Sequence, residues 1–154
     1  MDESATAAEP SEPSDNAQGT WLAHSGELRS IRIALRSWLA PLHLGTATED
    51  DLILATNEAA SNAIDHAYPP ALGGDGAEHT VGVTLHSEPG TVCIEITDHG
   101  TWRVPAAQPD SRGQGIPLMR GLVASVLIEK NGQGTRVLLH HPIAASLSAG
   151  TSTE

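Results

Sequence analysis

The chain has 154 residues and a formal net charge of −11, which suits one domain and argues against a surface built to bind nucleic-acid phosphates. Phenylalanine is absent and tyrosine occurs once, so leucine, valine, isoleucine and alanine must build the core, with the three tryptophans as local fillers. The single cysteine excludes an intramolecular disulfide, and no apolar run is long enough to span a membrane. We therefore expect a cytoplasmic protein that binds neither nucleic acid nor membrane.

Both ends of the sequence have the composition of disordered tails. Residues 1–18 are rich in Ala, Ser, Pro, Asp and Glu and contain no basic residue. Small and polar residues likewise dominate the sequence after His141. We expect one folded domain over residues 19–142, flanked by tails at 1–18 and 143–154.

The first elements are predicted to be a short strand over residues 20–23 and then a helix. Ser25 is expected to cap this helix, and Pro41 to break its last turn. Apolar residues recur in it at steps of three and four, at Leu28, Ile31, Leu35, Trp38, Leu39 and Leu42. Another face carries Arg29, Arg32 and Arg36, which form either a solvated face or a docking stripe for an acidic protein partner.

A second helix is predicted over residues 51–68. Thr48 is expected to cap it, with Asp51 as the acidic half of a capping box, and Pro69-Pro70 to end it. Glu58 and Asn62 stand four residues apart, so both side chains leave one face near the apolar flank. Polar groups buried there need partners, so the pair is either solvated or part of a site.

Two alternating runs, over residues 81–85 and 92–97, predict an antiparallel hairpin with its turn at 88–90. Cys93 lies within the second run and is expected simply to pack. The hairpin follows a Pro- and Gly-rich loop over residues 69–78. It ends at Asp98-His99-Gly100, which alone indicates a plain turn.

A polar loop over residues 101–112 leads to Gly113-Gln114-Gly115, which opens an apolar run from Ile116 to Val123. A glycine-rich loop that enters a helix exposes backbone N–H groups, and these can bind phosphate. The spacing fits neither a P-loop nor a dinucleotide fingerprint.

A second hairpin is predicted from the runs around residues 126–128 and 137–139, joined by Asn131-Gly132 and Gly134-Thr135. The strands are thus grouped apart from the helices along the chain. This order predicts an α+β fold, a two-layer α/β sandwich whose mostly antiparallel sheet has helices on one face.

Four short motifs now stand in a set order: Glu58-x-x-x-Asn62, Asp98-x-Gly100, Gly113-x-Gly115 and Gly134-Thr135. Together they resemble the N, G1, G2 and G3 boxes of the Bergerat-fold ATP-binding proteins, the histidine-kinase-like ATPase superfamily, over residues 20–141. The sequence RGQGIPLMRGLV is most similar to the bacterial anti-sigma-factor serine kinases.

The resemblance implies a site for ATP and Mg²⁺. It assigns Asn62 to the metal ion, and its neutral amide oxygen suits magnesium held mainly by waters and phosphates. It assigns Asp98 to the adenine 6-amino group, with Gly100 turning the chain close to the base and Thr135 bonding nearby. The phosphates would meet the segment that carries Arg112, Gly113, Gly115 and Ile116. Glu58 resembles the general base.

Three features depart from the superfamily pattern. No second glycine follows Gly100 at the usual spacing, Asp65 stands where a basic residue is common, and the loop over 101–112 is short and has no lysine. We expect this loop to act as a lid that is mobile without nucleotide and protected with it. Nucleotide is then held less tightly, or is ordered only when a partner docks.

The leading hypothesis is an ATP-dependent serine protein kinase that phosphorylates an anti-sigma-factor antagonist and binds a sigma factor. A nucleotide-gated protein-binding switch with little or no kinase activity is the alternative, and the resemblance also allows a homodimer. The catalytic domain of a histidine kinase is less favoured, because the segment up to Gln18 is too short and polar for a dimerising helical hairpin.

Overall fold

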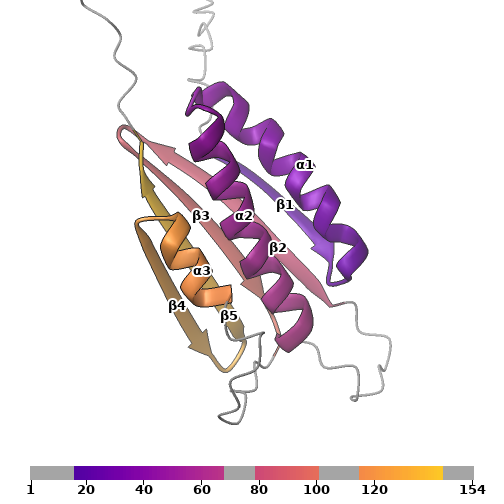
Figure 1. Cartoon of the computed structure of the whole chain (residues 1–154). Helices are drawn as coiled ribbons and strands as arrows, with labels where there is room; N and C mark the ends of the chain where they lie inside the picture. The colour runs from indigo at the N-terminus through magenta and orange to yellow at the C-terminus, as the bar shows by residue number, and fades with distance from the viewer. Residues whose placement is uncertain (1–15, 68–78, 101–114, 144–154) are drawn as a thin grey trace, which may run out of the picture.

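The structure, a computed structural model, describes residues 16–67, 79–100 and 115–143. Within these ranges five strands form one antiparallel sheet in the order β1-β2-β3-β5-β4, and the helices cover one of its faces (Figure 1). This confirms the predicted two-layer α+β sandwich.

The elements follow one another along the chain much as predicted. The strands are β1 (Asn16–Leu22), β2 (Thr80–Glu88), β3 (Thr91–Asp98), β4 (Ser125–Asn131) and β5 (Gly134–Pro142). The helices are α1 (Leu28–Leu39), α2 (Thr46–Asn62) and α3 (Gly115–Leu122). Short 3-10 turns occupy Ser25–Glu27 and Ala40–Leu42, and a π-helical turn, Ala63–Ala67, follows α2 directly. None of the described helices is long and apolar enough to cross a membrane.

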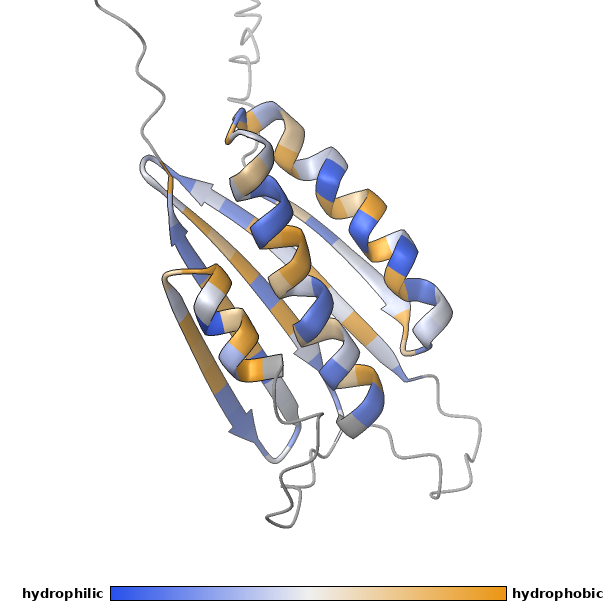
Figure 2. Cartoon of the chain, viewed as in Figure 1, coloured by the Kyte–Doolittle hydropathy of each residue, from blue (hydrophilic) through white to orange (hydrophobic). Residues whose placement is uncertain are grey.

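Alternate residues of the central strands face the helices and form an aliphatic core. The strands contribute Val81, Val83, Leu85, Val92, Ile94, Ile96, Val137 and Leu139. Facing them are buried residues of α1 and α2, among them Ile31, Leu35, Leu39, Leu52, Ala55 and Ala59. Apolar and polar residues alternate along both layers in Figure 2. Each fully buried leucine or isoleucine contributes roughly 1.5–3 kcal/mol, so this layer interface stabilises the fold.

An aromatic pair joins α1 to the edge strand. The rings of Trp21 on β1 and Trp38 on α1 lie with centroids 6.0 Å apart and planes tilted by 47°. Such pairs contribute about 0.5–1.5 kcal/mol beyond the area they bury. The Trp21 ring lies over Gly19, where a Cβ atom would stand only 2.5 Å from it. Trp21 and Trp38 therefore act as the local fillers that the composition predicted.

Two predicted helix starts are wrong. The helix α2 begins at Thr46, with Gly45 as its N-cap at φ 88°, so Thr48 lies inside the helix and caps nothing. Gly45 adopts this conformation without steric cost, which lets the helix begin at once. Ahead of α1, the side chain of His24 rather than Ser25 accepts the capping hydrogen bond, from Gly26 N–H.

Other boundaries were predicted in part. The first strand begins at Asn16, inside the segment assigned to the N-terminal tail, because its residues pair with β2 from Asn16↔His86 to Leu22↔Thr80. As Pro41 indicated, α1 ends at Leu39 and continues only as a 3-10 turn. The expected helix end at Pro69-Pro70 and the expected loop over 101–112 lie outside the described residues.

Candidate functional site

Four segments that are distant in sequence meet at one end of the sandwich: the end of α2, the end of β3, the start of β5 and the start of α3 (Figure 1). The π-helical turn after α2 contacts both β3 and β5, and α2 packs against α3. Across the sheet, Asp98 of β3 pairs with Thr135 of β5. The structure thus brings together the parts of the four predicted motifs that it describes.

Asp98 ends the row of β3 residues that faces the helices. Because side chains alternate along a strand, Asp98 follows Ile94 and Ile96 on that face and is only 4% exposed. The backbone N–H of Gly100 donates a hydrogen bond of 3.1 Å to the Asp98 Oδ1 atom. A buried carboxylate is thereby held in one orientation at the strand end.

Gly134 lets β5 approach the end of β3 unusually closely. Its φ is 147°, and a Cβ atom there would stand 1.9 Å from the backbone carbonyl oxygen of Asp98. No side chain fits such a contact. Thr135, the next residue, is 4% exposed and lies opposite Asp98. The Gly134-Thr135 motif therefore places a buried hydroxyl beside a buried carboxylate.

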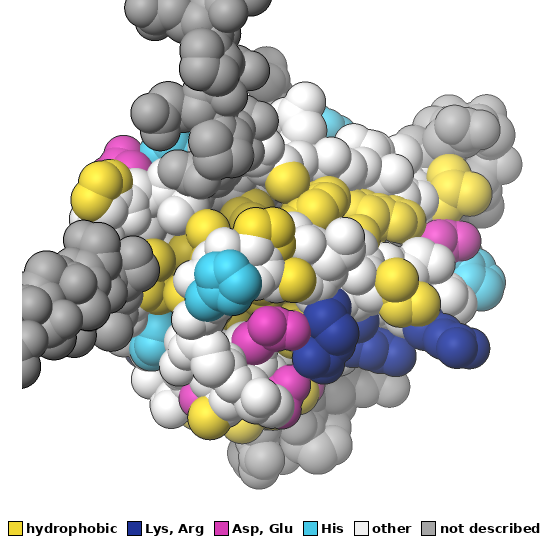
Figure 3. All heavy atoms as spheres, turned by 90° about the horizontal axis from the view of Figure 1, so that it is seen from above, with side chains coloured by type: hydrophobic (Ala, Val, Ile, Leu, Met, Phe, Trp, Pro, Cys, Tyr) yellow, Lys and Arg dark blue, Asp and Glu magenta, His cyan; other side chains and the backbone are white. Residues whose placement is uncertain are grey.

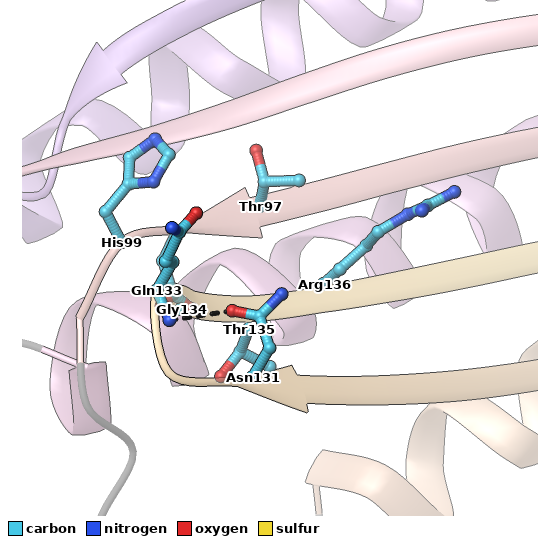
Figure 4. A pocket seen from close by; sticks show the side chains of 8 residues that line it. Thr97, His99, Asn131, Gln133, Gly134, Thr135 and Arg136 are labelled. Atoms are coloured by element: carbon cyan, nitrogen blue, oxygen red, sulfur yellow. Dashed lines mark hydrogen bonds between the residues drawn. The ribbon is translucent and has the colours of Figure 1, made fainter.

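A pocket of about 160 Å³ opens at this end of the sheet (Figure 4). The hairpin turn beside it is shaped by Asn131, whose Oδ1 accepts a 2.8 Å hydrogen bond from the Gln133 N–H. Small-molecule sites usually measure roughly 300–1,000 Å³, so the described residues alone do not form one here. Thr97 and Arg136 pair across β3 and β5 on the face of the sheet opposite the helices, whereas Asp98 faces the helices. The lining of the pocket comes from the end of β3 and the β4–β5 hairpin: Thr97, Asp98, His99, Asn131, Gln133, Gly134, Thr135 and Arg136.

Glu58 and Asn62 lie on the flank of α2 that faces α3. The opposite flank is marked by Asn57, whose Oδ1 accepts a 2.8 Å hydrogen bond from Arg32 of α1. At about 100° per residue, Glu58 and Asn62 stand roughly 100–140° around the helix from Asn57. Both are half-buried, and neither forms a hydrogen bond or ion pair within the described part of the chain. This pair is therefore free to contact a ligand.

The α-helix widens immediately after Asn62. The N–H of Ala63 is shared between the carbonyls of Ala59 and Ala60, and the chain continues as the π-helical turn. Single π turns inside helices occur frequently at functional sites. Ala63 is 1% exposed and anchors this turn in the core, so Asn62 is held next to the strand ends.

The glycine-rich motif is described only from Gly115, where α3 begins; Arg112 and Gly113 lie outside the described residues. Met119 is fully buried and fixes α3 against the core, while Ile116 is half-buried. The first N–H groups of a helix have no partner within it. The start of α3 therefore presents donors at the same end of the sandwich.

Sequence reasoning missed five of the residues that line the pocket: Thr97, His99, Asn131, Gln133 and Arg136. The only available signal was their adjacency to Asp98 and Gly134-Thr135. Arg136 is already occupied, because its guanidinium pairs with Glu95 at 3.3 Å and Glu129 at 3.6 Å.

Cys93 lies on the same face of the sheet as Thr97, away from the helices. Burial raises the pKa of its thiol, and the Glu95 carboxylate raises it further. A thiol that stays protonated is a poor nucleophile. The expected packing role fits this environment.

Within the described ranges, no group of three or more His, Cys, Asp or Glu side chains could hold a metal ion. A metal ion bound here must therefore take most of its ligands from elsewhere. Magnesium commonly does so, keeping waters and substrate phosphates around one or two protein oxygens. The half-buried amide of Asn62 fits such a site.

The sequence matches the family model described as "Histidine kinase-like ATPase domain" over residues 22–140, a range that includes every predicted motif. Its fold is similar to that in the crystal structure of the RsbU and RsbW domains of Rv1364c from Mycobacterium tuberculosis, with a TM-score of 0.63 and 24% identity over 83% of this chain. The chain spans 32% of the length of that protein chain. At this identity the likeness establishes the fold alone.

Proposed function

Because the chain belongs to the histidine kinase-like ATPase domain family, we propose that it binds Mg²⁺–ATP where α2, β3, β5 and α3 meet. The observation that carries this proposal is the convergence of the motifs at one end of the sandwich. There the buried Asp98 carboxylate, the close approach of Gly134 and the Glu58–Asn62 pair, which has no partner among the described residues, lie on neighbouring elements.

Asp98 is proposed to accept a hydrogen bond from the adenine 6-amino group. The Gly100 N–H already orients the carboxylate, which lowers the cost of ordering it on binding. Guanine carries a carbonyl oxygen at that position, and it would face the carboxylate with no proton between them. An unsatisfied charged acceptor costs at least ~1–3 kcal/mol, so ATP is preferred over GTP. Thr135 lies beside this contact and would bond near the base.

Asn62 is proposed to be the residue that would hold the magnesium ion accompanying the nucleotide. The phosphates themselves would be bound by the segment that enters α3, with Gly115 and Ile116 at its described end and Arg112 and Gly113 just before it. Backbone N–H groups at a helix start attract phosphate through hydrogen bonds and the helix dipole.

We propose further that the protein is an ATP-dependent serine kinase acting on an anti-sigma-factor antagonist, with a sigma factor as its second partner in the cytoplasm. ATP would supply the γ-phosphoryl group: the serine oxygen bonds to its phosphorus, the bond to the β,γ-bridging oxygen breaks, and ADP leaves. Glu58 would orient the serine hydroxyl and take its proton as the oxygen attacks in line. The motif order and the fold match to an RsbW domain support this proposal.

A nucleotide-gated binding switch is the second candidate. The segment over residues 101–112 is short and has no lysine, and Asp65, an exposed acidic residue, stands where a basic one is common. These features favour weak phosphate binding. A phosphate-transfer assay with candidate antagonist proteins, each paired with a variant that lacks the acceptor serine, separates the two functions.

Replacing Asp98 with asparagine is expected to weaken ATP binding about 10- to 150-fold. The change removes a charge-assisted hydrogen bond, which contributes about 1.5–3 kcal/mol. Isothermal titration measures the affinity, and thermal unfolding measures stability in the same samples. Asp50→Asn is the matched control, since that exposed carboxylate pairs with Arg36 at 3.3 Å, outside the proposed site. If stability collapses while the folded fraction keeps its affinity, Asp98 is only a structural turn residue.

A further inference from the structure

The outer face of α1 carries a solvent-facing hollow of about 550 Å³ that the proposed nucleotide site does not use. In Figure 3 basic side chains gather beside acidic ones on this side of the molecule. Ile33, in the middle of the hollow, is 59% exposed, which is unusual for an isoleucine. We call this surface the arginine stripe; its residues are Arg29, Arg32, Ile33, Arg36, Ser37 and Ala40.

The positive charge of the arginine stripe is paired with carboxylates at one end only. Arg36 pairs with Glu49 at 3.1 Å and with Asp50 at 3.3 Å. Arg32 is bonded to the neutral amide of Asn57, and Arg29 has no partner among the described residues. Two guanidinium charges therefore face solvent without a carboxylate, in a chain whose net charge is −11.

The same chain contains a segment of opposite charge. Residues 9–15, which lie outside the described residues, read EPSEPSD and place an acidic residue at every third position: Glu9, Glu12 and Asp15.

The segment is also tethered within reach of the stripe. The strand β1 starts at Asn16, at the end of the sandwich where α1 finishes, and Trp21 and Trp38 pack β1 against α1 (Figure 1). From Asn16, an extended chain covers about 13 Å to Glu12 and about 23 Å to Glu9. The whole of α1 is about 18 Å long. Glu12 and Glu9 can therefore reach Arg32 and Arg29.

We propose that residues 9–15 dock on the arginine stripe of their own chain as an acidic strap. Exposed ion pairs are individually weak and are screened by salt, so the docked strap exchanges with a free one. The tether compensates for this weakness by giving a high effective concentration. While docked, the strap covers Ile33 and occupies the face on which another acidic segment could bind. This inference does not depend on the proposed nucleotide site.

Nuclear magnetic resonance of the full chain tests the strap. The Nε–Hε signals of Arg29 and Arg32 and the methyl signals of Ile33 are compared between the native chain and Glu9→Gln/Glu12→Gln. The control, Asp2→Asn/Glu3→Gln, makes the same change of net charge further from β1. Both pairs of substitutions precede the first strand, so the fold is retained.

The stripe signals are expected to shift in Glu9→Gln/Glu12→Gln and not in the control. The difference should vanish at about 1 M salt, where the Debye length is about 3 Å. Equal shifts in both variants, or no shift in either, would overturn the proposal. A further sample mixes the isotope-labelled Glu9→Gln/Glu12→Gln chain with excess unlabelled native chain. If its stripe signals return to their native positions, the segment binds a second copy, and docking within one chain is wrong.

Discussion

Replacing Glu58 with alanine is expected to slow phosphate transfer to an acceptor serine about 10²–10⁴-fold and to leave ATP affinity nearly unchanged. The reason is that neighbouring side chains are assigned separate roles. Asn62 is assigned to the metal ion and Asp98 to the base, so Glu58 acts on the nucleophile alone. Alanine is also the best helix former, and α2 should keep its structure.

The isosteric Glu58→Gln variant is the control for shape, because it removes the proton acceptor and keeps the side-chain length. Both variants should lose transfer equally. Loss of ATP binding in Glu58→Ala would show that the roles given to Glu58 and Asn62 are wrong. Retained transfer would remove Glu58 from the catalytic residues. If the native chain transfers no phosphate to any antagonist, the binding switch becomes the better account.

Gly134→Ala is expected to lower the free energy of unfolding by several kcal/mol. Forcing a side chain into the Gly134 backbone conformation costs about 1–3 kcal/mol. The new Cβ would lie 1.9 Å from the Asp98 carbonyl oxygen, so the end of β3 must move away. This movement costs about 1–3 kcal/mol more. The same movement separates Thr135 from Asp98, so the folded fraction should also bind ATP more weakly.

Gly132 supplies a matched control for this substitution. It lies in the same hairpin turn, and a Cβ atom there would meet nothing within 4 Å. Urea unfolding of Gly134→Ala and Gly132→Ala, followed by ATP titration, compares the two. If the two variants are equally stable, the close approach of β5 to β3 does not constrain the native fold.

Much of the fold could be predicted because apolar residues recur with a different period in strands than in helices. The alternation of Val92, Ile94 and Ile96 gave β3, and the three- and four-residue steps from Leu28 to Leu42 gave α1. The errors arose at boundaries, where tertiary pairing and backbone conformation decide. The residues from Asn16 to Gly19 have weak strand propensity and are ordered by pairing with β2.

The parts of the candidate site that depend on short-range sequence spacing could be predicted. The four-residue step of Glu58 and Asn62 put both on one helix face, and Asp98-x-Gly100 marked a strand end. The π-helical turn after Asn62 left no recognisable pattern, since it depends on how α2 packs against β3 and β5. Nor could the sequence reveal the contact between Gly134 and the Asp98 backbone, which joins residues on different strands.

The central claim, that the motifs form a Mg²⁺–ATP site, is tested most directly by calorimetric titration of the native chain with Mg²⁺–ATP and with Mg²⁺–GTP. We expect saturable binding of ATP at one site per chain, with GTP at least about tenfold weaker because its carbonyl oxygen would face Asp98. Absence of ATP binding, or equal affinity for the two nucleotides, would contradict it.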